Sequence, residues 1–148
     1  MKQGVPSGWQ YVAAQLILLL IIVLAPGGSF GFPNWMALPM IIIGLILVAL
    51  AGSSLGSALS VLPRPTEAGD LVTTGLYGVV RHPIYTGVLL SALGWALLRG
   101  STIGLVVTVV LFVLFDRKAA VEEGHLSARF AGYAAYKARV RKLIPLVY

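Results

Sequence analysis

Four apolar segments, separated by short stretches with Gly, Pro and charged residues, dominate the chain. They cover residues 9–25, 35–60, 84–98 and 102 to about 115. Crossing the hydrocarbon core of a bilayer takes a helix of about 20 mostly apolar residues. Residues 3–63 contain no Lys, Arg, Asp or Glu, and a small soluble domain has too much surface to hide such a stretch. The pattern therefore predicts an all-α, polytopic membrane helical bundle with four transmembrane helices.

The chain is expected to form one domain over residues 1–148, made of two unequal parts. Residues 1–60 supply two N-terminal spans. Residues 61–148 supply most of the polar chemistry and a short helical hairpin. Residues 84–98 would measure only about 22 Å as a helix, and Arg99 begins a tight turn into the fourth span.

Small residues recur every four or eight positions in the second span, at Gly44, Gly52, Gly56 and Ser60. At helical spacing they are expected to form one smooth face. Gly52 and Gly56 make a GxxxG pattern, which allows close helix contact. This face is expected to pack within the chain, and it also allows a dimer.

Charge is scarce and unevenly distributed. Only 11% of the residues are charged and 58% are hydrophobic, whereas about 25% are charged in an ordinary soluble domain. The net charge of +6 is explained by cytoplasmic loops, which collect Lys and Arg, rather than by nucleic acid. With both termini cytoplasmic, every basic residue except Arg99 lies on that side. These are Lys2, Arg64, Arg81, Arg117, Lys118, Arg129, Lys137, Arg139, Arg141 and Lys142.

The chain has no cysteine and only two histidines, His82 and His125. Disulfides, thiolate nucleophiles and thiolate metal sites are therefore excluded. A multi-histidine metal centre is not expected either, and we predict no metal site.

The sequence from Asp116 onward is basic and amphipathic, and it predicts a C-terminal cytoplasmic helix. One face of this helix would carry Glu122, Leu126, Arg129, Tyr133, Tyr136 and Val140, by their helical spacing. Gly124 and Gly132 are candidate interruptions.

The first candidate site precedes the third span, where Arg81, His82, Tyr77 and Tyr85 lie within nine residues. Pro83 suits the first turn of a helix, where its missing N–H costs nothing. A helix start also leaves N–H donors free for an anionic ligand group. The alternative is an interfacial anchor, because Arg and Tyr are common at headgroup level.

The second candidate site is the adjacent pair Glu122 and Glu123, just beyond the fourth span. On a solvated face these carboxylates would pair with Arg117, Lys118 or Arg129. As hydrogen-bond acceptors they also suit an ammonium group or ribose hydroxyls.

The residues between 62 and 145 resemble a known family. The run L-V-T-T-G-L-Y-G-V-V-R-H-P-I-Y-T-G is followed by E-E-x-x-L-x-x-x-F and by Y-x-x-Y before I-P. This combination resembles the isoprenylcysteine carboxyl methyltransferase and phospholipid methyltransferase family. Two features depart from it: Leu76 replaces the usual proline of Gly-Pro-Tyr, and the spacing from Phe130 to Tyr133 is one residue shorter.

The resemblance implies a small helical membrane enzyme that uses S-adenosylmethionine in a cytoplasmic pocket. Carried over by motif, the cofactor-binding residues are His82, Pro83, Tyr85, Gly87, Glu122, Glu123, Tyr133 and Tyr136. The catalytic residues implied are Arg81, Glu122 and Arg139. Methyl transfer is an in-line displacement, so alignment is the main task.

The methyl acceptor is expected to carry a lipid tail that enters from the bilayer. A carboxylate acceptor is already a nucleophile and needs a positioned arginine, with Arg81, Arg129 or Arg139 as candidates. An amine acceptor needs a base such as Glu122, Glu123 or His82. The sequence leaves both open.

Two other functions compete with methyl transfer. Membrane reductases of the sterol-reductase type use NADPH and carry a similar R-H-P-N-Y motif, but Ile84 stands where that motif has Asn. A small four-span transporter usually needs an ionisable residue inside a span, and the four predicted spans contain no Asp or Glu.

Overall fold

The computed structural model describes residues 8–28, 30, 32–56, 59–60, 62 and 70–148. Its helices are α1 (Gly8–Leu24), α2 (Asn34–Leu55), the 3-10 helix η2 (Gly75–Gly78), α3 (Pro83–Leu98), α4 (Thr102–Arg129) and α5 (Tyr133–Arg139). Within these residues the only β-type pairing is one isolated bridge, between Val80 and Arg141. The prediction of an all-α fold is confirmed. Lys2 and Arg64, which entered the charge argument, lie outside the described residues.

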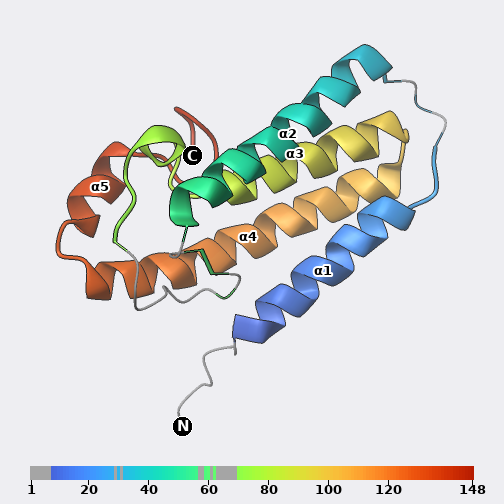
Figure 1. The fold of residues 1–148 in the computed structure, drawn as a ribbon. Helices are drawn as coiled ribbons and strands as arrows, with labels where there is room; N and C mark the ends of the chain where they lie inside the picture. The colour runs from blue at the N-terminus through green and yellow to red at the C-terminus, as the bar shows by residue number, and fades with distance from the viewer. Residues whose placement is uncertain (1–7, 29, 31, 57–58, 61, 63–69) are drawn as a thin grey trace, which may run out of the picture.

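The four long helices lie side by side in the order α2, α3, α4, α1 (Figure 1). Helix α3 packs against both α2 and α4, and α1 packs mainly on α4. One end of the bundle carries η2, α5 and the C-terminal residues, and the other carries the α1–α2 and α3–α4 connections (Figure 1). The polar motifs therefore gather at one end.

The α3–α4 turn needs a glycine at position 100. Its φ is +60°, and an added Cβ would lie 2.7 Å from the Phe30 carbonyl oxygen. Gly28 donates its N–H to the Arg99 carbonyl at 3.1 Å. The two connections thus hold each other at the end of the bundle opposite the polar motifs.

Close contact between α2 and α3 depends on a pair of facing glycines. A Cβ on Gly87 would lie 2.6 Å from the Gly44 carbonyl oxygen, and one on Gly44 would lie 2.5 Å from that of Gly87. The predicted smooth face packs within the chain at Gly44, but α2 ends at Leu55 and so does not carry Gly56 and Ser60. Gly52 faces open space, while Gly56, with φ +49°, ends the helix well before residue 60.

Helix α4 is one continuous helix, so the prediction of a separate amphipathic helix beginning at Asp116 is wrong. The Ser101 hydroxyl caps its start by accepting from the Gly104 N–H at 3.1 Å. Nothing after that breaks it, since Gly124 alone costs only about 1 kcal/mol in a helix. The break comes after Arg129, where Phe130 is extended, and Gly132 precedes the short α5.

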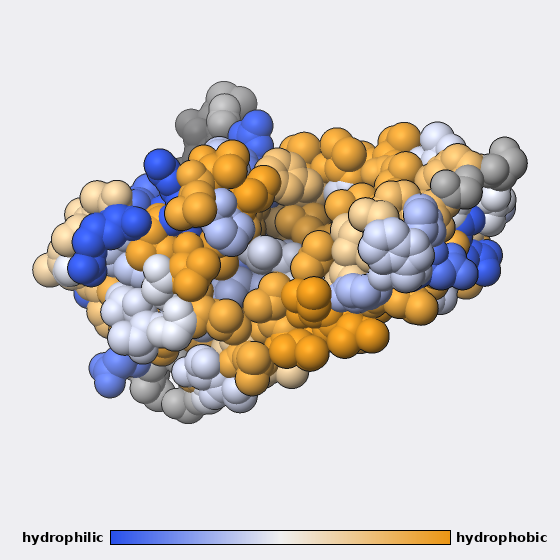
Figure 2. Space-filling model, turned by 90° about the horizontal axis from the view of Figure 1, so that it is seen from above, coloured by the Kyte–Doolittle hydropathy of each residue, from blue (hydrophilic) through white to orange (hydrophobic). Residues whose placement is uncertain are grey.

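The outer surface of the long helices is apolar. Exposed side chains include Ile17 and Leu20 on α1, Ile46 on α2 and Val109 on α4, and orange side chains cover much of the face in Figure 2. Among the described helices, only α2 is both long enough and apolar enough to cross a membrane. Helices α1 and α3 are apolar but shorter. Such a surface suits lipid rather than water.

Candidate active site

The first motif is held in place by the C-terminal residues. The Arg81 N–H donates to the Arg141 carbonyl at 2.7 Å, and the His82 N–H donates to that of Lys142 at 3.1 Å. The Thr86 hydroxyl donates to the Leu143 carbonyl at 2.6 Å. Residues 81 and 82 are thereby fixed directly before α3.

Glu123 is the centre of a buried network of ion pairs. Its Oε1 accepts from Arg81 Nε at 2.8 Å and from His82 Nε2 at 3.1 Å, and its Oε2 lies 3.0 Å from Lys137 Nζ. Burial would raise the pKa of Glu123, but the hydrogen bonds from His82, Arg81 and Lys137 outweigh it and lower this pKa to about 2. The ionised carboxylate carries no hydrogen, so His82 Nε2 must be the donor.

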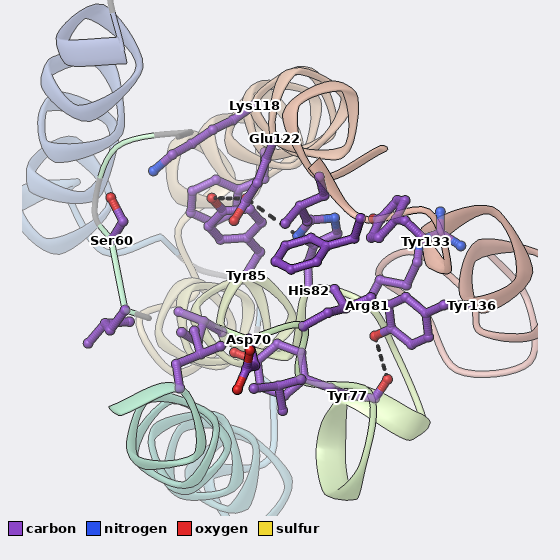
Figure 3. Close-up of a pocket in the computed structure, with 18 of the residues that line it drawn as sticks. Ser60, Asp70, Tyr77, Arg81, His82, Tyr85, Lys118, Glu122, Tyr133 and Tyr136 are labelled. Atoms are coloured by element: carbon purple, nitrogen blue, oxygen red, sulfur yellow. Dashed lines mark hydrogen bonds and ion pairs between the residues drawn. The ribbon is translucent and has the colours of Figure 1, made fainter. Parts of the chain in front are cut away.

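Glu122 occupies a different environment from its neighbour. Its side chain is 28% exposed, and its Oε2 accepts from the Tyr85 hydroxyl at 3.0 Å. The same oxygen lies 3.6 Å from His82 Nδ1. Of the two adjacent carboxylates, Glu123 is thus sequestered by cations, whereas Glu122 faces the cavity (Figure 3).

A cavity of about 250 Å³ lies at this end of the bundle, between α1, α2, α3, α4 and α5. Six of the predicted site residues line it: Arg81, His82, Tyr85, Glu122, Tyr133 and Tyr136. The other four do not line it. Glu123 lies behind Arg81 and His82, and Pro83 begins α3. Gly87 packs against α2, and Arg139 is exposed on α5.

Two tyrosines of α5 form one end of the cavity. Tyr136 donates its hydroxyl to the Tyr77 carbonyl at 2.6 Å, and burial raises the pKa of Tyr136 to about 12. Tyr133 is 1% exposed, and its buried hydroxyl has no hydrogen-bond partner among the described residues. Buried polar atoms are nearly always paired, so this hydroxyl is available to bond a ligand in the cavity that Tyr133 lines.

Aromatic rings form the wall beside Glu122. The Tyr85 ring stacks on His82 at 5.4 Å and on Phe115 at 4.7 Å between centroids. Lys118 Nζ lies 5.2 Å from the centre of the Tyr85 ring and donates to Gln15 Oε1 at 3.0 Å. A ligand in the cavity therefore contacts flat apolar faces as well as charges.

Several lining residues were not predicted as site residues, among them Gln15, Asp70, Phe115 and Lys118, whereas Tyr77 belongs to the first candidate site. For Gln15 a signal existed, because it is a strongly polar residue inside an apolar segment. Lys118 was considered only as a cytoplasmic cation and as a possible ion-pair partner of Glu122 or Glu123. Phe115 has no sequence signal beyond its apolar character.

Residues 32–132 match the model of the family described as "Phospholipid methyltransferase", which covers more than half of the chain. The chain belongs to the phospholipid methyltransferase family. The resemblance drawn from the R-H-P-x-Y motif and the glutamate pair is confirmed. Membership in a methyltransferase family favours methyl transfer over the reductase and transporter hypotheses.

Several curated relatives of this family member are isoprenylcysteine O-methyltransferases. The protein-S-isoprenylcysteine O-methyltransferase of Schizosaccharomyces pombe is 31% identical over 163 residues, covering 95% of this chain and 69% of the relative. Protein-S-isoprenylcysteine O-methyltransferase B of Arabidopsis thaliana is 33% identical, covering 74% of this chain and 58% of the relative.

A solved structure has the same fold. It is that of the eukaryotic intramembrane Ras methyltransferase ICMT (isoprenylcysteine carboxyl methyltransferase), with a TM-score of 0.73 and 22% identity. The match covers 93% of this chain but 53% of that one, so this family member spans about half of the solved chain. The match confirms the predicted all-α fold, which is that of an intramembrane enzyme in the solved structure.

Proposed function

We propose that the protein transfers a methyl group from S-adenosylmethionine to a lipid-tailed acceptor at the cytoplasmic side of a membrane. The observation that carries this proposal is the juxtaposition of Glu122 and the unpartnered Tyr133 hydroxyl on one cavity. In a methyltransferase family, such a cavity is the expected place for the methyl donor.

The lining residues fit the polar groups of S-adenosylmethionine, which supplies an electrophilic methyl group when bound. The Glu122 carboxylate suits its ammonium group or its ribose hydroxyls. The Tyr133 hydroxyl offers one hydrogen bond that no described protein group takes. Aromatic rings that line the cavity attract the positive sulfonium.

Glu123 acts on the site indirectly in this proposal. It holds Arg81 and His82 through one shared oxygen, and Lys137 holds its other oxygen. Because Glu123 does not line the cavity, we assign it as a positioning residue. Arg139, exposed on α5, and Gly87, packed between helices, have no catalytic or cofactor-binding role in this assignment.

An isoprenylcysteine-type carboxylate is the acceptor that the named relatives favour. Such an acceptor is already a nucleophile, so it needs alignment rather than a base. Arg81 lines the cavity and is itself held by Glu123 and the Lys137 carbonyl, which suits a fixed cation. A phospholipid amine is the second candidate, with Glu122 or His82 as its base.

We further propose four spans with both termini cytoplasmic. Helices α1, α2 and α3 and the first half of α4 would cross the bilayer, with the second half of α4 extending into the cytoplasm. Arg99 lies in the α3–α4 turn, at the end opposite the charged cluster. This arrangement follows the rule that cytoplasmic loops collect Lys and Arg.

Calorimetry on the purified protein in detergent tests the proposed cofactor. S-adenosylhomocysteine is expected to bind, and NADPH is not. Labelled methyl transfer from S-adenosylmethionine into a panel of prenylated cysteines, free phospholipids and prenylated thiols then identifies the acceptor. Binding of NADPH without binding of S-adenosylhomocysteine would overturn the proposal in favour of a reductase.

A further inference from the structure

Lys118 is a buried cation whose described partners are neutral. The residue is 2% exposed, and its Nζ donates to Gln15 Oε1 at 3.0 Å and lies over the Tyr85 ring. No ion pair within 4 Å joins Lys118 to a carboxylate of the described residues. Glu122, one helical turn away, is instead bonded to Tyr85.

Such a burial is costly unless something compensates the charge. Removing an ammonium from water carries a penalty of several kcal/mol in real proteins. A single amide oxygen, a ring face and the more distant Glu122 carboxylate offset only part of it, since a cation–π contact contributes about 2 kcal/mol when desolvated. Gln15 is itself a polar side chain on an apolar helix, α1. A buried Lys and a half-buried Gln that keep each other in place indicate a function beyond packing.

The pair lies on the wall of the cavity, at the side away from α5. In Figure 3 the Lys118 ammonium points toward the side of Ser60, and Tyr133 and Tyr136 lie on the opposite side. Leu55 and Leu59 line the cavity as well and give it apolar walls. A ligand with an apolar body and an anionic head matches this combination.

We propose that Lys118, positioned by Gln15, is an anion-binding residue of the cavity beside Arg81 and pairs with a carboxylate on the ligand. The proposal rests on the function proposed above. The carboxylate has two candidate sources there, the acceptor headgroup and the methionine part of the cofactor. The position of Lys118 opposite Tyr133, on the side of α1, favours the acceptor.

Four variants separate charge from packing. Lys118→Met removes the charge and keeps the length, whereas Lys118→Arg keeps the charge. Gln15→Glu places a carboxylate beside Lys118 with almost no change of shape, so it neutralises the ammonium while adding an ion pair. Arg117→Met is the matched control, because Arg117 is the exposed neighbour of Lys118 on the same helix and does not line the cavity.

Binding affinities of the detergent-solubilised protein for three probes are measured by calorimetry. The probes are N-acetyl-S-farnesylcysteine, its uncharged carboxamide and S-adenosylhomocysteine. The wild-type protein and Arg117→Met are expected to prefer the acid over the carboxamide by at least tenfold. Lys118→Met and Gln15→Glu should lose this preference, and Lys118→Arg should retain most of it. S-adenosylhomocysteine affinity should stay unchanged.

The outcomes distinguish an acceptor carboxylate from the cofactor carboxylate. They also distinguish a failure of the proposed Lys118 role from a failure of the proposed function. A tenfold loss of S-adenosylhomocysteine affinity, with the acid preference intact, supports anion binding and assigns it to the cofactor carboxylate. Unchanged affinities for all probes in both Lys118→Met and Gln15→Glu overturn the role of Lys118. A wild-type protein that binds no S-adenosylhomocysteine contradicts the proposed function instead. Palmitate and palmitamide then report the anion preference of Lys118 without any methyl donor.

A thermal melt excludes a purely structural explanation. If Lys118 only stabilises the bundle, the new ion pair in Gln15→Glu should preserve affinity along with stability. Under our proposal the melting temperature is held or raised while affinity for the acid falls. A parallel fall of both quantities in every variant would overturn it.

Discussion

At the residue scale, the site separates two adjacent carboxylates by environment rather than by chemistry. Glu123 is 4% exposed and bonded to Arg81, His82 and Lys137, so its charge stabilises the local structure of the site. Glu122 bonds to one tyrosine and lines the cavity, so its charge is available to a ligand. Motif matching groups the two residues, and only the geometry separates their roles.

Replacing Tyr133 by Phe tests the role of its unpartnered hydroxyl. Removing a buried hydroxyl that lacks a partner should leave the protein as stable or slightly more stable, because the desolvation cost disappears. If a ligand accepts that bond, affinity for S-adenosylhomocysteine should fall about tenfold, or roughly 1.4 kcal/mol. Calorimetry and a thermal melt measure the two effects. Unchanged affinity would contradict a ligand contact at this hydroxyl.

The ion pairs of Glu123 predict acid sensitivity with a definite sign. Its pKa is lowered from the ordinary 4.5 to about 2 in the folded protein. A carboxyl group whose pKa is lower in the folded than in the unfolded protein stabilises the fold at pH values above its unfolded-state pKa. This stabilisation is lost as the pH falls through the folded-state pKa. Melting temperature should therefore decline between about pH 4.5 and 2.

The variant Glu123→Gln supplies the control for this acid effect. It should melt lower than the wild type at pH 7 and show a weaker decline between pH 4.5 and 2. The remaining decline is expected from Asp116, whose pKa is lowered by its hydrogen bond to Lys142. Parallel pH curves for the two proteins would exclude Glu123 as the source.

At the element scale, the position of the first motif depends on how closely α2 and α3 approach each other. Gly44 and Gly87 let the two backbones meet, and α3 begins directly after His82. A shift of α3 would therefore displace His82 and Tyr85 relative to the Glu122–Glu123 pair on α4. Packing between α2 and α3 and the geometry of the site are therefore coupled through one helix.

The variant Gly87→Ala should demonstrate this coupling. Its new Cβ would lie 2.6 Å from a backbone oxygen, and overpacking of this kind costs about 1–3 kcal/mol. Gly52→Ala on α2 is the matched control, because nothing lies within 4 Å of its Cβ position and alanine favours a helix. We expect Gly87→Ala to lower both the melting temperature and cofactor affinity, and Gly52→Ala to lower neither. Equal effects would refute the close-contact argument.

At the scale of the whole molecule, the sequence predicts the helices better than it predicts the cavity. Apolar segments and breakers such as Gly100 located the long helices, because local signals govern helix ends. The sequence does not predict that α4 continues past Asp116. The charged residues that begin there mark the membrane boundary, and a helix can continue through such a boundary. The contact between Lys118 and Gln15 joins residues 103 positions apart, and no local pattern encodes such a distance.

The proposed topology makes a prediction that the cysteine-free chain can test cleanly. Arg99→Cys and Ala128→Cys each introduce a single exposed thiol, at opposite ends of the bundle. If both termini are cytoplasmic, an impermeant maleimide applied to sealed, right-side-out membrane vesicles should label Arg99→Cys and spare Ala128→Cys. Inverted vesicles should give the opposite pattern, because the charged end that carries the site then faces the reagent. Labelling of both variants from one side would contradict a bundle that spans the bilayer between these positions.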